Sequence, residues 1–343
     1  MLLRKYAVMR KLVKPTAFSL GLGMLALSWP SIPAIAGTSS ISTLIQTSVD
    51  CNGNTITALQ PPTGGAMPVS ALTGLPAASL PAQLQSTSMN WIVPQCTLGH
   101  PSSGGPTVPT GVVPTNNIPS SGNQPYLNWS GFEAETHVYS VVDLGWTVPR
   151  VTYPGTGSNP LSAIWDGLGY GSTNSNMLVQ AGTEQDASSP SSYYVWFMLL
   201  PMELQQQVLS NFPINPGDSM FVSVSHSGSG VASFSISDLT SGKGTAFNEV
   251  WGSHYTIGTQ ANWILERTQV GSNYQQLANV GTVPFNSAYA SYGGTPYALG
   301  SLNRYYSYMW ACGYSSYIAK TGSLDSSGTA FPITWYGYGG TCS

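Results

Sequence analysis

Short runs of β-branched and aromatic residues, separated by Gly, Pro, Asn and Asp, dominate the chain from Tyr126 onward. In SMFVSVSHS, apolar residues alternate with small polar ones, as in a strand that buries one face. Many such strands, with turn signals about every 8–12 residues, are typical of an antiparallel β-sandwich or jelly roll. The stretch MELQQQVLSNF at 202–212 is the one candidate helix, and the turn sequence PINPGD follows it. We therefore expect an all-β fold.

The first 36 residues have the pattern of a secretory signal peptide. Basic side chains precede the apolar run AFSLGLGMLALSW, and Ala34 and Ala36 supply the small residues of a cleavage site. An uncleaved anchor is the alternative, but the run is short for a membrane span of about 20 apolar residues. We expect cleavage after Ala36, a secreted protein and no stable membrane association.

Composition divides the remaining chain into four segments. Residues 37–96 are small, polar and weakly patterned, and 97–125 form a Pro/Gly/Ser/Thr linker without charge. The strand pattern occupies 126–290, and a tail rich in Tyr, Gly and Ser covers 291–343. Because an exported chain with a leading segment and a flexible joint resembles a zymogen, we interpret 37–96 as a pro-segment. A permanent accessory region is the alternative.

Charged side chains make up only 7% of the chain. Loss of the signal peptide leaves five basic residues against thirteen acidic ones, a formal charge of −8 with His neutral. This balance argues against nucleic acid as a partner. Acid unfolds proteins mainly by protonating carboxylates that are paired in the native state, so a chain with few charges suits an acidic medium.

Four cysteines lie near the two ends of the exported chain, and an oxidising environment predicts two disulfides. Three pairings are possible, of which we favour Cys51–Cys96 and Cys312–Cys342, one within each end region. The cysteine and histidine spacing gives zinc little support. We expect no metal and no cofactor.

Familiar hydrolase signatures are absent: the chain has no G-x-S-x-G, no H-E-x-x-H and no D-[ST]-G, and its four histidines lie apart. Glu133 and Glu135 stand two residues apart, so a strand would point both to one face. Such a pair could hydrolyse a glycosidic bond. A solvated strand face is the more common reason for this spacing.

Two apolar strands each contain one polar side chain suited to catalysis. In ANWILERT, Glu266 shares a strand face with Ile264, and partial burial would raise the pKa of its carboxyl so that it can give or take a proton in acid. In SNMLVQAGT, Gln180 shares a face with Leu178 and offers both N–H donors and a carbonyl acceptor. A strand glutamate paired with a surface cation is the alternative reading of Glu266.

Seven motifs, in this order, resemble landmarks of the eqolisin family of glutamic peptidases: NWSGF, SAIWDGLGY, MLVQAGTE, YYVWF, INPGDSMFVSV, SISDLTSGK and ANWILER. The resemblance covers about residues 126–290. It implies a sandwich of two curved antiparallel sheets, made as a precursor, that hydrolyses proteins in acid with a Gln–Glu dyad. By motif, this dyad corresponds to Gln180 and Glu266.

The resemblance also implies a substrate cleft lined by Trp129, Trp165 and Phe197, the last where the family has a tyrosine. Three positions depart from the family pattern. Val195 stands where the family has a glutamate, and Met198 replaces a proline. The loop after Trp165 reads DGLGYG, where the family has V-G-I-D-G. Subsite shape is therefore open, and the tail from 291 lies outside the resemblance.

From this we expect a monomeric acid endopeptidase acting on polypeptides. In the expected mechanism, ionised Glu266 acts as general base on an attacking water, Gln180 orients the water and stabilises the oxyanion, and Glu266 then protonates the leaving amine. Two alternatives stay open. One is a carbohydrate-binding sandwich that uses exposed aromatics, Trp129 and the tyrosines of the tail, and the other is a glycosidase that uses Glu133 or Glu135.

Overall fold

The computed structural model describes residues 44–60, 67–68, 88–101, 123–155, 157–169, 177–227, 230–250 and 258–342. The predicted signal peptide lies outside these residues. The described part belongs to one compact unit built almost entirely of β-strands. No helix in this part is long and apolar enough to cross a membrane. The candidate helix at 202–212 is wrong, since most of it forms strand β12, whose Leu209 and Phe212 enter the core.

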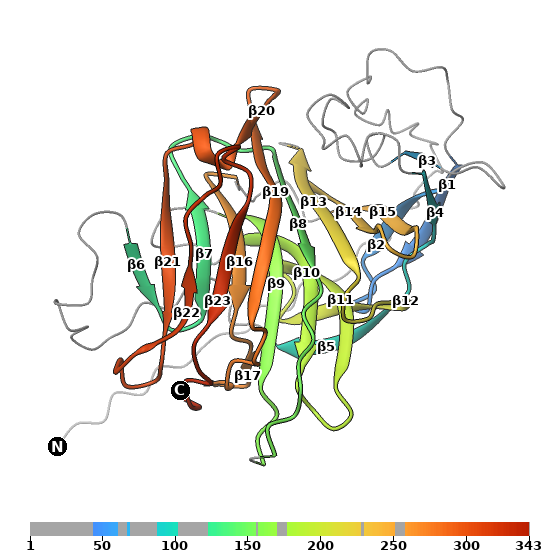
Figure 1. Ribbon diagram of the computed structural model, residues 1–343. Helices are drawn as coiled ribbons and strands as arrows, with labels where there is room; N and C mark the ends of the chain where they lie inside the picture. Colours follow the sequence, from blue (N-terminus) through green and yellow to red (C-terminus); the bar gives the residue numbers. More distant parts are fainter. Residues whose placement is uncertain are drawn as a thin grey trace, which may run out of the picture. The chain divides into compact units, whose positions relative to one another are not determined.

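Two sheets pack face to face (Figure 1). The first sheet, which we call the site sheet, contains in spatial order β5 (Cys96–Pro101), β12 (Gln205–Pro213), β11 (Ser192–Leu200), β10 (Leu178–Asp186), β9 (Leu161–Gly169), β16 (Gln260–Glu266), β7 (Trp129–Ala134), β21 (Arg304–Trp310) and β6 (Asn123–Tyr126). Its pairs are antiparallel except β21 with β6.

The second sheet contains in spatial order β1 (Leu44–Val49), β2 (Thr55–Gln60), β15 (Lys243–Val250), β14 (Val231–Asp238), β13 (Ser219–Ser227), β8 (Val141–Thr147) and β19 (Thr282–Tyr292), with β20 (Thr295–Ala298) and β23 (Phe331–Trp335) pairing along β19. Strand β22 (Tyr317–Thr321) pairs with both β21 and β23, and so links the two sheets. Smaller elements are β3 (Met67–Pro68), β4 (Ser88–Trp91), the β17–β18 ribbon (Gln269–Val270, Asn273–Tyr274) and the 3-10 turn η4 (Leu299–Ser301).

The main core lies between the sheets, where β9 and β10 pack against β8 and β13. Apolar residues at alternate positions of each strand fill it, because successive side chains point to opposite faces. The buried rings of Phe197, Phe234 and Phe247 contact one another there, with centroids 4.8–5.1 Å apart. This packing fixes which face of the site sheet is turned away from the core.

Both end segments belong to the sandwich. The predicted tail at 291–343 supplies β20 to β23, so it is structurally part of the β-domain rather than an appendage. In the predicted pro-segment, β2 pairs with β15, and the predicted linker begins within strand β5, which pairs with β12. Sequence periodicity missed these strands because Gly, Ser and Tyr give little apolar alternation.

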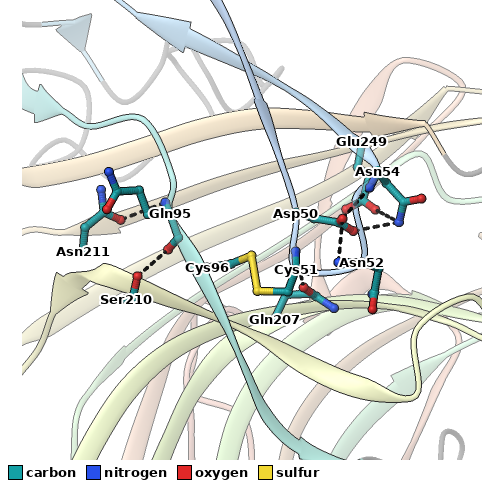
Figure 2. The surroundings of a disulfide bond; sticks show 10 residues. All are labelled: Asp50, Cys51, Asn52, Asn54, Gln95, Cys96, Gln207, Ser210, Asn211 and Glu249. Atoms are coloured by element: carbon teal, nitrogen blue, oxygen red, sulfur yellow. Dashed lines mark hydrogen bonds between the residues drawn. A yellow bond between two sulfur atoms is a disulfide. The ribbon is translucent and has the colours of Figure 1, made fainter.

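Both predicted disulfides, Cys51–Cys96 and Cys312–Cys342, are present. The first joins the turn after β1 to the start of β5, and so ties the two edge segments of the N-terminal region together (Figure 2). Gln207 of β12 accepts a hydrogen bond from the backbone N–H of Cys51 at 3.0 Å, which adds a link to the site sheet.

Candidate active site

Four neighbouring strands of the site sheet, β7, β16, β9 and β10, turn a buried, polar-rich face away from the main core. Strand register arranges its residues in three transverse rows: Trp129, Glu266, Ala163 and Glu184; Gly131, Ile264, Trp165 and Gly182; Glu133, Asn262, Gly167 and Gln180. We call these twelve residues the site face. Residues opposite one another in adjacent strands point the same way. The predicted pair Gln180 and Glu266 therefore shares one face.

Glu266 ends strand β16 and is only 5% exposed. The indole N–H of Trp165 donates to Glu266 Oε2 at 2.8 Å, and Asn128 Nδ2 donates to Oε1 at 3.4 Å. Asn128 immediately precedes β7, whose register places Trp129 beside Glu266. Residues of the NWSG and AIW motifs thus surround Glu266, the last residue of the motif ANWILE.

Burial raises the pKa of the Glu266 carboxyl to about 8. The nearby charge of Glu184 raises this pKa further, whereas hydrogen bonds from Trp165 and Asn128 lower it. Desolvation disfavours the charged form of a carboxyl and so dominates the balance. The raised pKa favours the protonated form of Glu266 in acid, whereas the mechanism expected from the sequence starts from the ionised form.

Gln180 lies in the middle of β10 and is 1% exposed. Its Nε2 contacts only the sulfur of Met198, at 3.9 Å, and its carbonyl Oε1 has no hydrogen-bond partner among the described residues. Asn262 Oδ1 and Glu133 Oε1, in the same transverse row, also lack one. Buried polar atoms are nearly always paired, so three unpaired acceptors in one row indicate a place that receives donors from a ligand or solvent.

The two predicted catalytic side chains are not hydrogen-bonded to each other. Gln180 lies opposite Gly167 and Glu266 opposite Ala163, four residues earlier on β9, which corresponds to about 13 Å of strand. Trp165 stands between these two positions. Contact with one shared water therefore requires both long side chains to lean toward each other over the Trp165 ring.

Aromatic residues form a second apolar cluster on this side of the sheet. Trp129 and Trp165 pack edge to face with ring centroids 4.9 Å apart, and Trp196 and Met198 belong to the same cluster. Phe197 does not: it lies opposite Ala181, on the core face, and packs against Phe234. The prediction that Phe197 lines the cleft is wrong, because strand alternation gives that face to its neighbours.

Sequence reasoning missed Glu184, which lies on the site face next to Ala163. Thr268 donates to Glu184 Oε1 at 2.6 Å and Gln206 to Oε2 at 3.0 Å. Burial raises the pKa of Glu184 to about 7, and the charge of Asp186 adds to the effect. Glu184 lies four residues after Gln180 on a strand that the sequence predicts, and an even spacing on a strand places both side chains on the same face. This spacing could have identified Glu184.

The carboxyl groups of Glu133 and Glu135, the acids of the glycosidase alternative, share the same two hydrogen-bond partners. Tyr305 Oη lies 3.0 Å from Glu133 Oε2 and 3.0 Å from Glu135 Oε1, and Gln260 Nε2 lies within 3.3 Å of both carboxyls. Trp129 is only 1% exposed, so it offers no open ring for sugar stacking. The premise of the carbohydrate-binding alternative is therefore removed for this residue.

Comparison with known proteins gives a consistent result. The model of the Peptidase A4 family matches residues 127–310. Aspergillopepsin-2 of Aspergillus niger is 26% identical over 194 residues, which is 49% of this chain and 65% of that protein, so the match spans less than two thirds of its length.

Solved structures agree on the fold. Scytalido-glutamic peptidase with a transition state analog inhibitor superposes with a TM-score of 0.53 at 19% identity, covering 61% of this chain and 98% of the other. SCP-B, described as a member of the eqolisin family in a complex with the tripeptide Ala-Ile-His, gives 0.50 at 19% identity and the same coverage. The sandwich predicted from strand patterns is thereby confirmed.

Proposed function

Since the chain belongs to the Peptidase A4 (eqolisin) family of glutamic peptidases, we propose that it is a secreted endopeptidase that hydrolyses proteins in acid through Glu266 and Gln180. One observation carries the proposal. A buried carboxyl, held by the Trp165 indole at 2.8 Å, shares a strand face with a buried amide whose carbonyl has no partner among the described residues. The two disulfides are consistent with an oxidising compartment.

Protonated Glu266 supplies the first proton in the proposed reaction. As the oxygen of water bonds to the scissile carbon, the carbonyl electron pair moves to oxygen, which takes the Glu266 proton. A water proton passes to the vacated carboxylate, and Glu266 then delivers it to the amide nitrogen as the carbon–nitrogen bond breaks. The proton of one hydroxyl returns to Glu266 as the product acid forms. No acyl-enzyme is involved, and the catalyst ends as it began.

Gln180 has two roles in this scheme. Its unpaired Oε1 accepts a hydrogen bond from the attacking water, and its Nε2 donates to the carbonyl oxygen as negative charge develops there before the Glu266 proton is fully transferred, since Met198 sulfur is a weak competing acceptor. Trp129 and Trp165 form an apolar wall beside Glu266 that limits the access of water to its carboxyl. These roles require the two side chains to meet over Trp165 when a peptide is bound.

The direct test is digestion of an unfolded protein by the purified chain at about pH 3.5, in the range where a carboxyl of raised pKa stays protonated. Peptides should appear without a metal or cofactor and in the presence of pepstatin, which imitates the intermediate of an aspartic dyad. Complete inhibition by pepstatin would assign the cleavage to aspartates instead.

Maturation can be followed in the same sample. We propose that the chain is clipped within the segment 97–125 that separates the N-terminal strands from the β-domain. N-terminal sequencing should find new ends there at acid pH, and none in Glu266→Gln. Because β2 and β5 pair with the sandwich, the clipped N-terminal piece should stay attached until the sheets are separated.

A further inference from the structure

Three buried carboxyl groups that do not belong to the site face meet one another. Asp50 follows β1, Glu203 lies in the turn between β11 and β12, and Glu249 is on β15. One carboxyl oxygen from each lies within 4.8 Å of the others. Figure 2 shows Asp50 and Glu249 beside Asn54, next to the Cys51–Cys96 disulfide. We call these three residues the acid triad.

The acid triad is buried and has no basic partner. Asp50, Glu203 and Glu249 are 4%, 1% and 0% exposed. Among the described residues the ion pair that forms is His100–Asp186, so no ion pair reaches the triad. A buried charge is costly unless it is paired or binds a metal, and three like charges multiply that cost.

Two oxygens of the triad also have no donor from outside it in the described part of the chain. Leu199 N donates to Glu203 Oε2 at 2.7 Å and Asn54 Nδ2 to Glu249 Oε1 at 3.4 Å. No donor outside the triad reaches Glu203 Oε1 or Glu249 Oε2 among the described residues, and within the triad the Asp50 carboxyl lies within hydrogen-bond reach of both glutamates. Asp50 is already fixed by Asn54 N at 2.6 Å and Asn52 N at 2.9 Å. The donors thus orient each carboxyl and leave one oxygen of each glutamate available as a ligand.

We propose that the acid triad binds one Ca²⁺ ion. The donor set is oxygen only, and its three carboxyls become negatively charged together once a cation displaces their protons, which suits a hard divalent cation rather than zinc or copper. The separation of the three oxygens fits ligands placed around one ion, since Ca–O distances are about 2.3–2.6 Å. No histidine or cysteine belongs to the triad, and its three members are scattered along the chain, so the spacing of metal motifs could not reveal it.

A bound cation would join three structural elements. Asp50 belongs to the N-terminal region, Glu203 to the site sheet and Glu249 to the second sheet. The ion would therefore hold the N-terminal strands on the sandwich at the same place as the Cys51–Cys96 disulfide. At neutral pH, calcium is expected to strengthen this attachment.

The test is equilibrium dialysis of the full chain at neutral pH with radioactive Ca²⁺, after removal of metal by a chelator. We expect one ion bound per chain and a Tm that rises with Ca²⁺ concentration, as it must for a ligand of the native state. Glu249→Gln should weaken binding at least about tenfold, because it removes one of the three charges on which affinity depends. Its amide oxygen can still accept the Asn54 hydrogen bond.

Asp186→Asn is the matched control, since Asp186 belongs to the other acidic group, with His100 and Glu184. Its Ca²⁺ affinity should equal that of the unaltered chain. If Glu249→Gln fails to fold, Asp50→Asn takes its place, because Asn can still accept the two backbone hydrogen bonds. Absence of Ca²⁺ binding by the unaltered chain, or equal binding by the triad variants, would overturn the proposal.

Discussion

The two faces of β10, β9, β16 and β7 carry opposite chemistry although alternate residues of the same segments form them. The core face presents Ile164, Ala181 and Trp263, and the site face presents glutamates, amides and tryptophans. Both faces are buried. Burial alone therefore does not reveal function here, and neither does an unpaired buried atom, since both carboxyl oxygens of Asp166 on the core face also lack a partner among the described residues. The informative difference is that the site face gathers several glutamates and amides, whereas the core face is mainly apolar.

Glu266→Gln tests this difference with the largest expected effect. The amide can still accept the Trp165 N–H but has no proton to give, so kcat/KM on a protein substrate at acid pH should fall by about 10⁴-fold. The free energy of unfolding should not fall, because a neutral amide replaces a carboxyl that burial already keeps uncharged. Assays of activity and urea unfolding on the same preparation check both.

Glu133→Gln is the matched control for that experiment. Glu133 lies on the same face, and burial likewise raises the pKa of its carboxyl to about 8. Activity should fall by far less in Glu133→Gln than in Glu266→Gln, because Glu133 can only receive donors from a ligand and gives no proton in the proposed reaction. The reverse result would transfer the chemistry to the Glu133–Glu135 pair.

Gln180→Met should have the next largest effect. The variant keeps the length of the side chain but removes both the carbonyl acceptor and the N–H donor, and one lost oxyanion donor costs about 10²–10³ in kcat. Gln185→Met changes a glutamine of the same strand that bonds Thr183 and Ser162 instead, and its kcat per folded molecule should be unchanged. A normal kcat for Gln180→Met would leave the amide without a catalytic role.

The core face contains one acid, Asp166, which gives a pH-dependent test of intermediate size. Asp166 is fully buried opposite Ala181 and Trp263, and burial, then the charge of Asp143, holds its pKa well above the usual range. A carboxyl with a raised native pKa keeps a proton that the unfolded chain releases above about pH 3.9. Stability should therefore be greatest in acid and decline as pH rises from there, by up to about 1.4 kcal/mol per pH unit for this group.

Asp166→Asn removes the titration, so the decline between acid and neutral pH should become shallower. Urea unfolding at several pH values measures the slope for both proteins. An unchanged slope would mean that Asp166 is solvated and that other buried carboxyls cause the dependence. The raised pKa of buried carboxyls such as Asp166 thus gives a physical reason why the folded protein should be more stable in acid. The low charge density of the sequence only suggested this.

The sequence predicted the strand-rich class from local alternation, and both disulfides from the place of the cysteines in the two end regions. It supplied the pair Gln180 and Glu266 through the family motifs, but not the face that they share. It failed where contacts come from distant segments. Tyr/Gly/Ser-rich strands such as β21 carry little apolar periodicity, yet they pair with β7 beside the site. Phe197 was assigned to the cleft from its position in the family motif, without asking which face of the strand its side chain occupies. The acid triad requires three segments that only the folded sheets bring together.

Phe197 and Met198 give the finest test of the two faces, since they are neighbours that point in opposite directions. Phe197→Leu leaves a small void among Phe234 and Phe247, so it should cost about 1–2 kcal/mol of stability with kcat/KM unchanged. Met198→Leu is close in volume and should cost less than about 1.5 kcal/mol, but it removes the sulfur that contacts Gln180 Nε2. We expect it to alter kcat/KM by a few fold. If Phe197→Leu instead changed KM while Met198→Leu did not, strand β11 would present the other set of side chains to the peptide, and the assignment of the site face would have to be reversed.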